Sequence, residues 1–399
     1  MREHTKRNVG MDVARIAAMV MVLVAHTTVY EIDPGIFPVR NILANIGVDI
    51  FFVLSGYLYG KSFWNSTETF SVKRFHINRM LRILPVYYVV ILFTKLISGN
   101  EIRLLCFTLL QNFWEEPLNF MPTAWSLCVE EWFYILLSIV FCVMLYFLNR
   151  RNGKKTEKPQ EVKRAEQEQK ENEKKANGSK READADSKRG KSMVLAVFFL
   201  MLAGILIRSI CVIANPTLDF DSGIRKQTFL RMDTFAYGIF AAYLELRYNK
   251  TYKKIMRSPF PFLIATGLVL SGSFVIYKFV YGANSIVAKI GLFTVLPIGL
   301  LYFVLRFKDS AILNHPKVAA VSPITGFLSK LTYPLYLVHF QFYIYFSNYC
   351  RYQGIVIRTE YIAKAIVYSI LLALVIHFLI ELPVEVLRKK LKKQKIYTG

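Results

Sequence analysis

Long apolar stretches alternate with shorter polar ones along almost the whole chain. A helix needs roughly 20 mostly apolar residues to cross a bilayer, and ten stretches come near that length. The pattern predicts membrane-spanning helices at residues 11–30, 42–60, 84–98, 126–148, 193–213, 228–246, 260–280, 288–306, 331–347 and 361–382. We therefore expect an all-α polytopic membrane protein.

Charge is distributed unevenly between these stretches. The chain has 399 residues, of which 54% are hydrophobic and 20% are charged, and its formal net charge is +23. Such an excess can indicate nucleic-acid binding, but here most Lys and Arg residues occupy alternate connections between apolar stretches. That asymmetry is typical of the cytoplasmic side of a membrane. We expect a plasma-membrane protein in the lipid bilayer, with both termini cytoplasmic and no nucleic-acid partner.

One polar segment divides the chain. Residues 149–192 contain few large apolar side chains and mix both signs of charge, so we expect a cytoplasmic linker that is disordered or loosely helical. The alternative is a strip that lies on anionic lipid. The linker separates four spans in residues 1–148 from six spans in residues 193–385, and residues 386–399 form a basic cytoplasmic tail.

The cysteine pattern indicates neither a disulfide framework nor a metal site. The five cysteines are scattered and no CxxC or zinc-like Cys/His spacing occurs, so no metal is expected. The first apolar stretch lacks a small-residue cleavage site, and we expect it to be retained.

The first predicted span carries ionisable residues, which are costly at membrane depth and therefore suggest function. Arg15 and His26 are eleven residues apart, which places them on nearly the same helix face, about 16 Å apart along the axis. A guanidinium suits a phosphate or carboxylate, and an imidazole suits proton transfer near neutral pH. We expect both side chains to face one shared cavity.

Asp49, in the second span, is expected at a depth similar to that of His26. Its carboxylate could orient the imidazole or stabilise its charge. The alternative is a carboxylate that bonds a neighbouring hydroxyl and only joins helices. Gly47, Ser55 and Gly56 in the same span are expected at close helix contacts.

The basic segment Phe70–Pro85 precedes the third span on the cytoplasmic side. Arg79 and Arg82 are three residues apart, so on a helix they are neighbours and could clamp a phosphate, with Arg74 nearby. The alternative is an interfacial anchor that binds lipid headgroups.

The fourth span opens with aromatic and acidic residues. Glu130 and Glu131 point in different directions on a helix, so one of them at most faces a given cavity, and we select Glu130. Trp125 and Trp132 could contact substrate or could belong to the aromatic belt of the membrane interface.

Later spans add three further polar groups. Arg231 and Asp233 could pair with each other or with neighbouring helices. The ninth span contains Pro334 and offers the polar groups of Tyr333, Tyr336 and His339, although a single intramembrane His can also be packing alone. His377 and Glu381 are spaced so that they can bond each other.

With these residues in hand, the chain resembles the acyltransferase-3 family of integral-membrane acyltransferases. The resemblance rests on the spacing of Arg15 and His26 and on the segments GVDIFFVLSGYL, RMLRILPVYY, AWSLCVEEWFY, RMDTFAYG and LTYPLYLVHF, in this order over nearly all of the chain except the linker. It implies a helical bundle that encloses a reaction cavity. It also implies that His26 is the essential base or acyl-transfer residue and that Arg15, Arg79 and Arg82 handle the donor.

The implied activity is O-acyl transfer from cytoplasmic acyl-CoA, with acetyl-CoA as the expected donor, to a hydroxyl of an envelope or exported carbohydrate or a lipid-linked sugar. The candidate catalytic residues are His26, Arg15, Glu130 and Asp49; the donor-binding candidates are Arg74, Arg79 and Arg82; the substrate-binding candidates are Trp125, Arg231, Tyr333 and His339. A carrier or flippase for an anionic or sugar-lipid cargo, or a non-catalytic sensor, remains the alternative.

Overall fold

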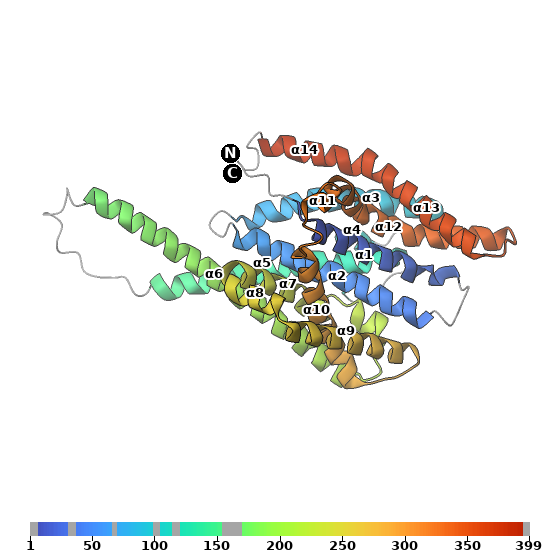
Figure 1. Cartoon of the computed structure of the whole chain (residues 1–399), viewed down its shortest axis with the longest axis horizontal. Helices are drawn as coiled ribbons and strands as arrows, with labels where there is room; N and C mark the ends of the chain where they lie inside the picture. The colour runs from blue at the N-terminus through green and yellow to red at the C-terminus, as the bar shows by residue number, and fades with distance from the viewer. Residues whose placement is uncertain are drawn as a thin grey trace.

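The structure is a computed structural model, and it describes residues 7–30, 37–65, 70–98, 104–113, 120–153 and 170–393. Within these residues every regular element is a helix, and none of them forms a strand. Figure 1 shows the long helices gathered into one bundle, with part of α6 extending away from it. The expected all-α architecture is confirmed.

In the described part of the chain, eight helical segments are long and apolar enough to cross a membrane. The helices that contain them are α1 (Val9–His26), α2 (Phe37–Trp64), α3 (Val72–Ser98), α5 (Trp125–Gly153), α6 (Lys170–Ala214), α9 (Pro259–Val280), α10 (Ile286–Lys308) and α13 (Thr359–Ile376), the last of which continues through η6 (His377–Glu381) into α14 (Leu382–Lys393). The chain is a multi-pass membrane protein.

The other two predicted spans are also helices, but they differ from the eight. They are α7 (Met232–Arg247), which has only 16 residues, and α12 (Ser322–Tyr352), which has 31 residues. α12 is long enough to cross a bilayer, but its polar side chains lower its hydropathy. Several of these polar side chains, from Ser329 to Tyr336, line an internal cavity.

Shorter helical turns connect the long helices. They are η1 (Thr27–Tyr30), α4 (Leu104–Thr108), η3 (Pro122–Ala124), η4 (Asp221–Arg225), η5 (Phe229–Arg231), α8 (Asn249–Arg257) and α11 (Pro316–Ala319). α8 buries Tyr252 and Met256 while its lysines stay exposed, which is the arrangement of a helix at an interface. Burial, together with the hydrogen bond from its hydroxyl to Asp309, raises the pKa of Tyr252.

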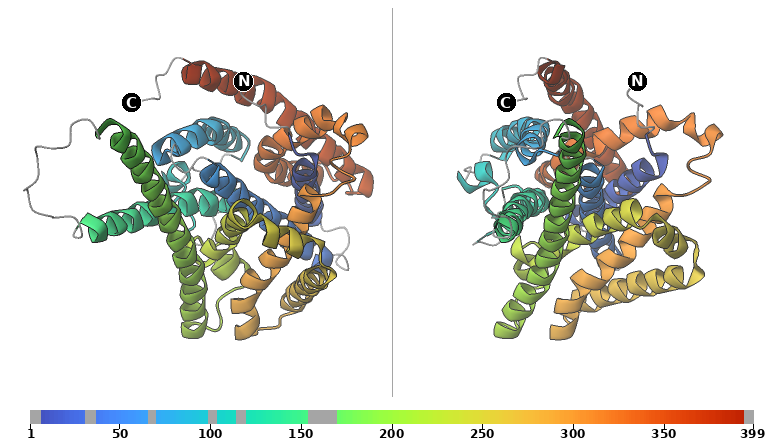
Figure 2. Two further views of the ribbon diagram at one scale, coloured as in Figure 1. Left: turned by 60° about the vertical axis from the view of Figure 1, so that its left-hand side comes forward. Right: turned by 90° about the vertical axis from the view of Figure 1, so that its left-hand side faces the viewer.

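Glycines bring α2 close to its neighbours near the centre of the bundle (Figure 2). A methyl group on Gly56 would overlap the carbonyl of Phe235 in α7, and one on Gly238 would overlap the carbonyl of Val53 in α2. Gly47 lies in the same way against the Ala18 carbonyl of α1. The predicted close contacts at Gly47 and Gly56 are therefore confirmed, because small residues let helix backbones approach.

Two predicted segments lie only partly in the described residues. Residues 170–192 of the predicted linker form the N-terminal part of α6, which projects beyond the bundle in Figure 1. Residues 154–169 of that linker lie outside the described residues. The predicted basic tail continues α14 as far as residue 393, and residues 394–399 lie outside the described residues.

The helix α13 passes into α14 through a π-helical segment, η6. Such segments insert an extra residue into a helix and occur often at functional sites. Inside η6, His377 Nδ1 lies 2.6 Å from Glu381 Oε2, so the predicted contact between these two residues is confirmed. Glu381 also lines an internal cavity of the bundle.

Candidate active site

A cavity of about 660 Å³ lies among α1, α2, α3, α5, α12 and the start of α14. Its lining begins at Arg7 and Asn8, before and at the start of α1, and at Arg388 of α14. Its opposite end is formed by Ser126 at the start of α5 and Tyr336 in the middle of α12. The cavity therefore runs from the end of the bundle where α1 begins toward the bundle centre.

Helical periodicity accounts for the lining. The α2 residues that face the cavity recur in steps of three and four and are Val48, Phe51, Phe52, Ser55, Leu58 and Tyr59. The α12 residues follow the same steps and are Ser329, Lys330, Thr332, Tyr333, Tyr336 and Leu337. Residues in such steps share one helix face. The sequence reasoning missed most of the α12 stripe, although this periodicity of polar residues was the signal that could have found it.

Arg79 is held by both acidic residues of α5. Its guanidinium lies 2.8 Å from Glu130 and 2.7 Å from Glu131, and its carbon atom Cζ lies 4.3 Å from the centre of the Tyr134 ring. Glu130 lines the cavity with Arg79, whereas Glu131 is buried behind them. Two carboxylates compensate this guanidinium, so Arg79 acts mainly as a fixed part of the wall.

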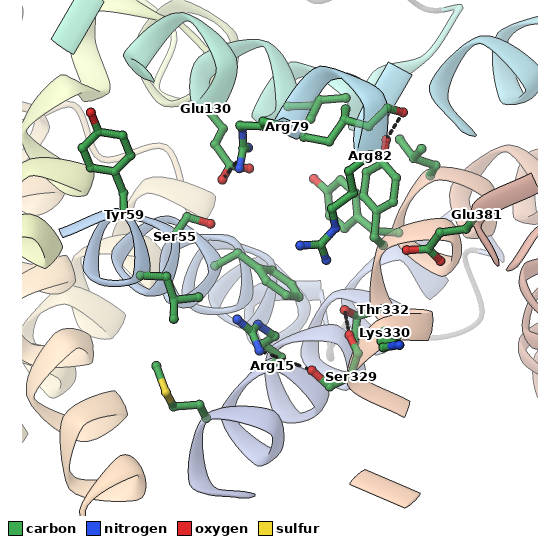
Figure 3. Close-up of a pocket in the computed structure, with 18 of the residues that line it drawn as sticks. Arg15, Ser55, Tyr59, Arg79, Arg82, Glu130, Ser329, Lys330, Thr332 and Glu381 are labelled. Atoms are coloured by element: carbon green, nitrogen blue, oxygen red, sulfur yellow. Dashed lines mark hydrogen bonds and ion pairs between the residues drawn. The ribbon is translucent and has the colours of Figure 1, made fainter. Parts of the chain in front are cut away.

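Arg82 differs from Arg79. Its guanidinium points into the cavity, as Figure 3 shows, and makes no hydrogen bond or ion pair with the described residues. A guanidinium left without a carboxylate is available to a phosphate. Arg74 is exposed and lies outside the cavity lining, so the structure does not bring it together with Arg79 and Arg82 as a clamp.

Arg15 lines the cavity from α1. Its Nη1 atom lies 3.4 Å from Asp12 Oδ1 and 3.4 Å from Ser329 Oγ of α12. Asp12 also binds Arg7 at 2.5 Å, so one buried carboxylate is shared by two guanidiniums. The guanidinium of Arg15 is therefore only partly compensated.

His26, at the end of α1, faces the same helix as Arg15. Its Nδ1 atom lies 2.7 Å from Nε2 of His339 in α12, and the two rings stack with centroids 5.0 Å apart. His339 is completely buried, whereas His26 is part-buried. The spacing of Arg15 and His26 thus places both against α12, and the two predicted histidines form a direct pair.

The predicted shared cavity is wrong as far as the described residues go, because the lining includes Arg15 but not His26. The hydroxyls of Ser126 and Tyr336 are 2.6 Å apart at the end of the cavity. Tyr336 lies one helical turn before His339, with ring centroids 5.8 Å apart. Ser126 and Tyr336 form a wall between the cavity and the histidine pair, and we call it the hydroxyl wall.

Asp49 does not orient His26. It forms a completely buried ion pair with Arg231, whose Cζ atom also lies 4.1 Å from the centre of the Phe293 ring. The predicted partnership between Asp49 and His26 is therefore wrong, and a buried guanidinium takes the carboxylate instead. Neither residue lines the cavity, so Arg231 is not placed to contact a substrate there.

A second buried ion pair joins α6, α7 and α10. Arg208 Nη2 lies 2.8 Å from Asp233 Oδ2 and 2.7 Å from the Thr294 hydroxyl, and the guanidinium also donates to the carbonyls of Leu230 and Ile290. Asp233 therefore pairs with a neighbouring helix and not with Arg231. We call Arg208, Asp233 and Thr294 the paired network.

The aromatic candidates differ in whether they line the cavity. Tyr333 lines the cavity and donates its hydroxyl proton to the carbonyl of Ile83 at 2.8 Å. Trp125 is buried outside the lining, where Arg225 lies over its ring at 4.9 Å. The Trp132 indole donates to the Leu109 carbonyl at 2.8 Å. Of the two tryptophans, neither is placed to contact a molecule in the cavity.

Beyond the histidines, the connection between α6 and α7 holds a compact charge cluster. Arg225 Nη1 lies 2.6 Å from Asp221 Oδ1, and Lys226 also pairs with Asp221. Burial opposes ionisation of Asp221, but the attraction of Arg225 and Lys226 outweighs it and lowers the pKa of the carboxyl to about 2. The carboxylate stays charged at neutral pH and fixes this connection.

The described residues contain no group of three or more His, Cys, Asp or Glu side chains placed to hold a metal ion. The five cysteines are free thiols, three of them buried. The cavity lining offers cations, hydroxyls and carboxylates, and the histidine pair lies next to its inner end.

The fold and this site define a helical membrane protein with a charged internal cavity. The acyltransferase-3 family, described as an acyltransferase domain, matches residues 8–379. Because this match covers most of the chain, the chain belongs to that family.

Two relatives are similar over shorter regions. A protein of Staphylococcus aureus (strain COL) named "Putative O-acetyltransferase" is 28% identical over 165 residues, which are 36% of this chain and 26% of that protein. The peptidoglycan O-acetyltransferase OatA of Listeria monocytogenes is 31% identical over 129 residues, which are 25% of this chain and 20% of that protein. The chain thus matches about a quarter or less of the length of either relative. The comparison with solved structures finds no match.

Proposed function

We propose that the chain is a membrane O-acyltransferase that moves an acyl group, with acetyl as the first choice, from cytoplasmic acyl-CoA to a hydroxyl of an envelope or exported carbohydrate. One observation carries this proposal: the cavity that holds the uncompensated Arg82 ends at the hydroxyl wall, directly before the His26–His339 pair. Family membership supports acyl transfer as the reaction.

The donor enters the cavity from the end where α1 begins, and the distribution of Lys and Arg supports a cytoplasmic location for that end. Arg82 binds a phosphate of coenzyme A, and Arg15 adds positive charge deeper in the cavity. A volume of about 660 Å³ falls in the range of pockets that hold small ligands. It suits the thioester arm of acyl-CoA, with the nucleotide part near the opening.

The acceptor approaches from the other side. His26 is the last residue of α1 and keeps accessible surface, although it does not line the cavity. A hydroxyl that reaches this end of the bundle meets the imidazole without passing through the donor cavity. The peptidoglycan acceptor in the name of the Listeria relative supports an envelope glycan or a lipid-linked sugar as the acceptor here.

For the reaction itself, the hydroxyl wall must open so that the thioester reaches His26. The imidazole takes the proton of the acceptor hydroxyl as the oxygen attacks the thioester carbon. The carbon–sulfur bond then breaks, and the thiolate leaves with the proton returned by the imidazolium.

A single base contributes about 10²–10⁴-fold to such a rate. The decisive experiment measures transfer from radiolabelled acetyl-CoA to glycan in vesicles that contain wild-type protein, His26→Ala or His26→Gln. We expect both variants to lose at least about 10²-fold in turnover. His315→Gln is the matched control, because His315 is exposed and caps the short helix α11. Undiminished turnover in folded His26→Ala protein would end this assignment.

The same vesicles separate the enzyme from a carrier or a sensor. An acyltransferase releases the free thiol of coenzyme A when the acceptor is added, in proportion to the label transferred. A carrier or sensor binds the same ligands but releases no thiol. Absence of thiol release with wild-type protein would favour the alternative class.

A further inference from the structure

Both ring nitrogens of His339 in the His26–His339 pair have a partner. His339 Nε2 lies 2.7 Å from His26 Nδ1, and His339 Nδ1 lies 3.0 Å from the carbonyl oxygen of Leu335. Both distances are in hydrogen-bond range. The completely buried His339 ring therefore bridges a backbone carbonyl on one side and the part-buried His26 ring on the other.

These two contacts determine where the protons lie. A carbonyl oxygen can only accept, so Nδ1 of His339 must carry the proton that points to Leu335. A neutral imidazole has one protonated nitrogen, so Nε2 of His339 is an acceptor. The proton between the two rings then belongs to Nδ1 of His26. The Nε2 atom of a neutral His26 is left with a free lone pair.

We infer that His339 is a positioning residue that holds His26 in the tautomer protonated at Nδ1, so that Nε2 of His26 is the base of the acyl transfer. This inference rests on the proposed function and names which atom of His26 takes the proton. His339 thus takes the orienting role that was predicted for Asp49. Asp49 instead forms an ion pair with Arg231.

The surroundings agree with a neutral orienting partner. The rings of Tyr336 and Tyr343 lie 5.8 Å from the His339 ring, and Phe340 lies 4.7 Å from the His26 ring. Among the described residues, none of the ion pairs places a carboxylate on either imidazole. The orienting group is therefore an imidazole nitrogen where other enzymes use a carboxylate.

This arrangement also defines the route of the proton. When His26 Nε2 accepts the hydroxyl proton, the imidazolium keeps its Nδ1 proton, and the hydrogen bond to His339 becomes charge-assisted and stronger. The proton cannot move on through His339, because the next group is the Leu335 carbonyl, which accepts a hydrogen bond but is too weakly basic to take a proton. It returns from His26 Nε2 to the departing thiolate. Each transfer cycle therefore starts and ends with the same tautomer.

Two amide substitutions separate positioning from packing. In His339→Gln, the side-chain oxygen can reach the place of Nε2 and accept from His26, whereas in His339→Asn the shorter amide reaches only the place of Nδ1. Loss of an orienting partner typically costs about 10–100-fold in activity. We expect His339→Asn to lose about that much kcat with little change in KM for acetyl-CoA, and His339→Gln to recover most of it. His315→Gln and His315→Asn are the matched controls and should leave kcat unchanged.

A spectroscopic measurement tests the tautomer without any enzyme assay. Nitrogen-15 NMR of protein labelled at its six histidines separates protonated from unprotonated ring nitrogens, and the His26 signals are assigned by their loss in His26→Gln. We expect protonated Nδ1 and unprotonated Nε2 for His26 in wild-type protein and in His339→Gln, and the opposite tautomer or a mixture in His339→Asn.

The outcomes distinguish the two proposals. A wild-type His26 protonated at Nε2, or a folded His339→Gln protein no more active than His339→Asn, overturns the positioning role. Wild-type protein that shows the expected tautomer but transfers no acetyl group supports the geometry of the pair and overturns the proposed function.

Discussion

The bundle contains two charged regions, and they differ in how completely their charges are compensated. In the paired network, every guanidinium nitrogen of Arg208 has a partner, and both Arg208 and Asp233 are completely buried. In the cavity, Arg82 has no partner among the described residues and Arg15 has only distant ones. Buried charges that find all their partners within the protein serve to join helices. Charges left without partners beside a cavity are the ones available to a ligand.

The largest expected effect comes from breaking the paired network. Arg208→Met leaves the Asp233 carboxylate buried without its partner, which should destabilise the protein by about 3–5 kcal/mol. Replacing both residues, in Arg208→Met with Asp233→Leu, should restore most of that loss because no uncompensated charge is left. Thermal unfolding in detergent measures both. A single variant as stable as wild-type protein would contradict the structural role of this pair.

The next largest expected effect is on the binding of acetyl-CoA and not on the stability of the protein. Arg82→Met removes one charge-assisted contact to a phosphate, which should raise KM for acetyl-CoA by roughly 10–100-fold. The unfolding temperature should stay near that of wild-type protein, since Arg82 has no partner to lose. Lys73→Met removes an exposed charge from the same helix and is the control. Steady-state kinetics at two salt concentrations measure the change in KM. If Lys73→Met raised KM equally, the donor would be attracted by the overall positive charge of this helix and not by Arg82 itself.

A smaller effect is expected at the hydroxyl wall. Tyr336→Phe removes the hydrogen bond to Ser126, and a bond of this kind contributes about 0.5–1.5 kcal/mol. A looser wall should admit water to the thioester and raise acetyl-CoA hydrolysis without acceptor by roughly 2–10-fold. Free-thiol release in the absence of glycan measures this. Tyr345→Phe, on the exposed side of the same helix, should have no effect.

The smallest effect belongs to Asp221, whose side chain is 46% exposed. Its pKa in the folded protein is about 2, below the value of about 3.9 for an unfolded chain. Its contribution to stability is therefore fully present above about pH 4 and is lost as pH falls through about 2. We expect a small fall in unfolding temperature for Asp221→Asn that is constant from pH 7 to 5 and vanishes toward pH 2. A difference that grows at low pH would contradict this sign.

The sequence predicts the features that depend on the length and periodicity of a single helix. The length of each apolar stretch locates the spans, and a separation of eleven residues places Arg15 and His26 against the same neighbour, α12. The difference in direction between Glu130 and Glu131 likewise follows from helix geometry, and only Glu130 lines the cavity.

Contacts between side chains of different helices could not be predicted, because they depend on which helices pack against each other. Asp49 and Arg231 are separated by 182 positions, and nothing in either segment indicates that they meet. The same holds for Arg208, which was not a candidate although it is the partner of Asp233. The hydroxyl wall also requires two helices, so the separation between the cavity and His26 could not be derived from the first span alone.

The π-helical segment η6 affects how α14, the helix that follows it, is rotated about its own axis. Deleting one residue such as the exposed Leu379 from η6 would return this stretch to ordinary winding and leave α14 close to its present orientation, because the π-helical turn absorbs the extra residue. A deletion in the ordinary α-helical winding of α13 would instead turn α14 by about 100° and draw it in by about 1.5 Å. Glu385 and Arg388 would then swing away from the cavity that they now line. A one-residue difference in phase thus decides whether the C-terminal helix presents its charges inward or to the lipid.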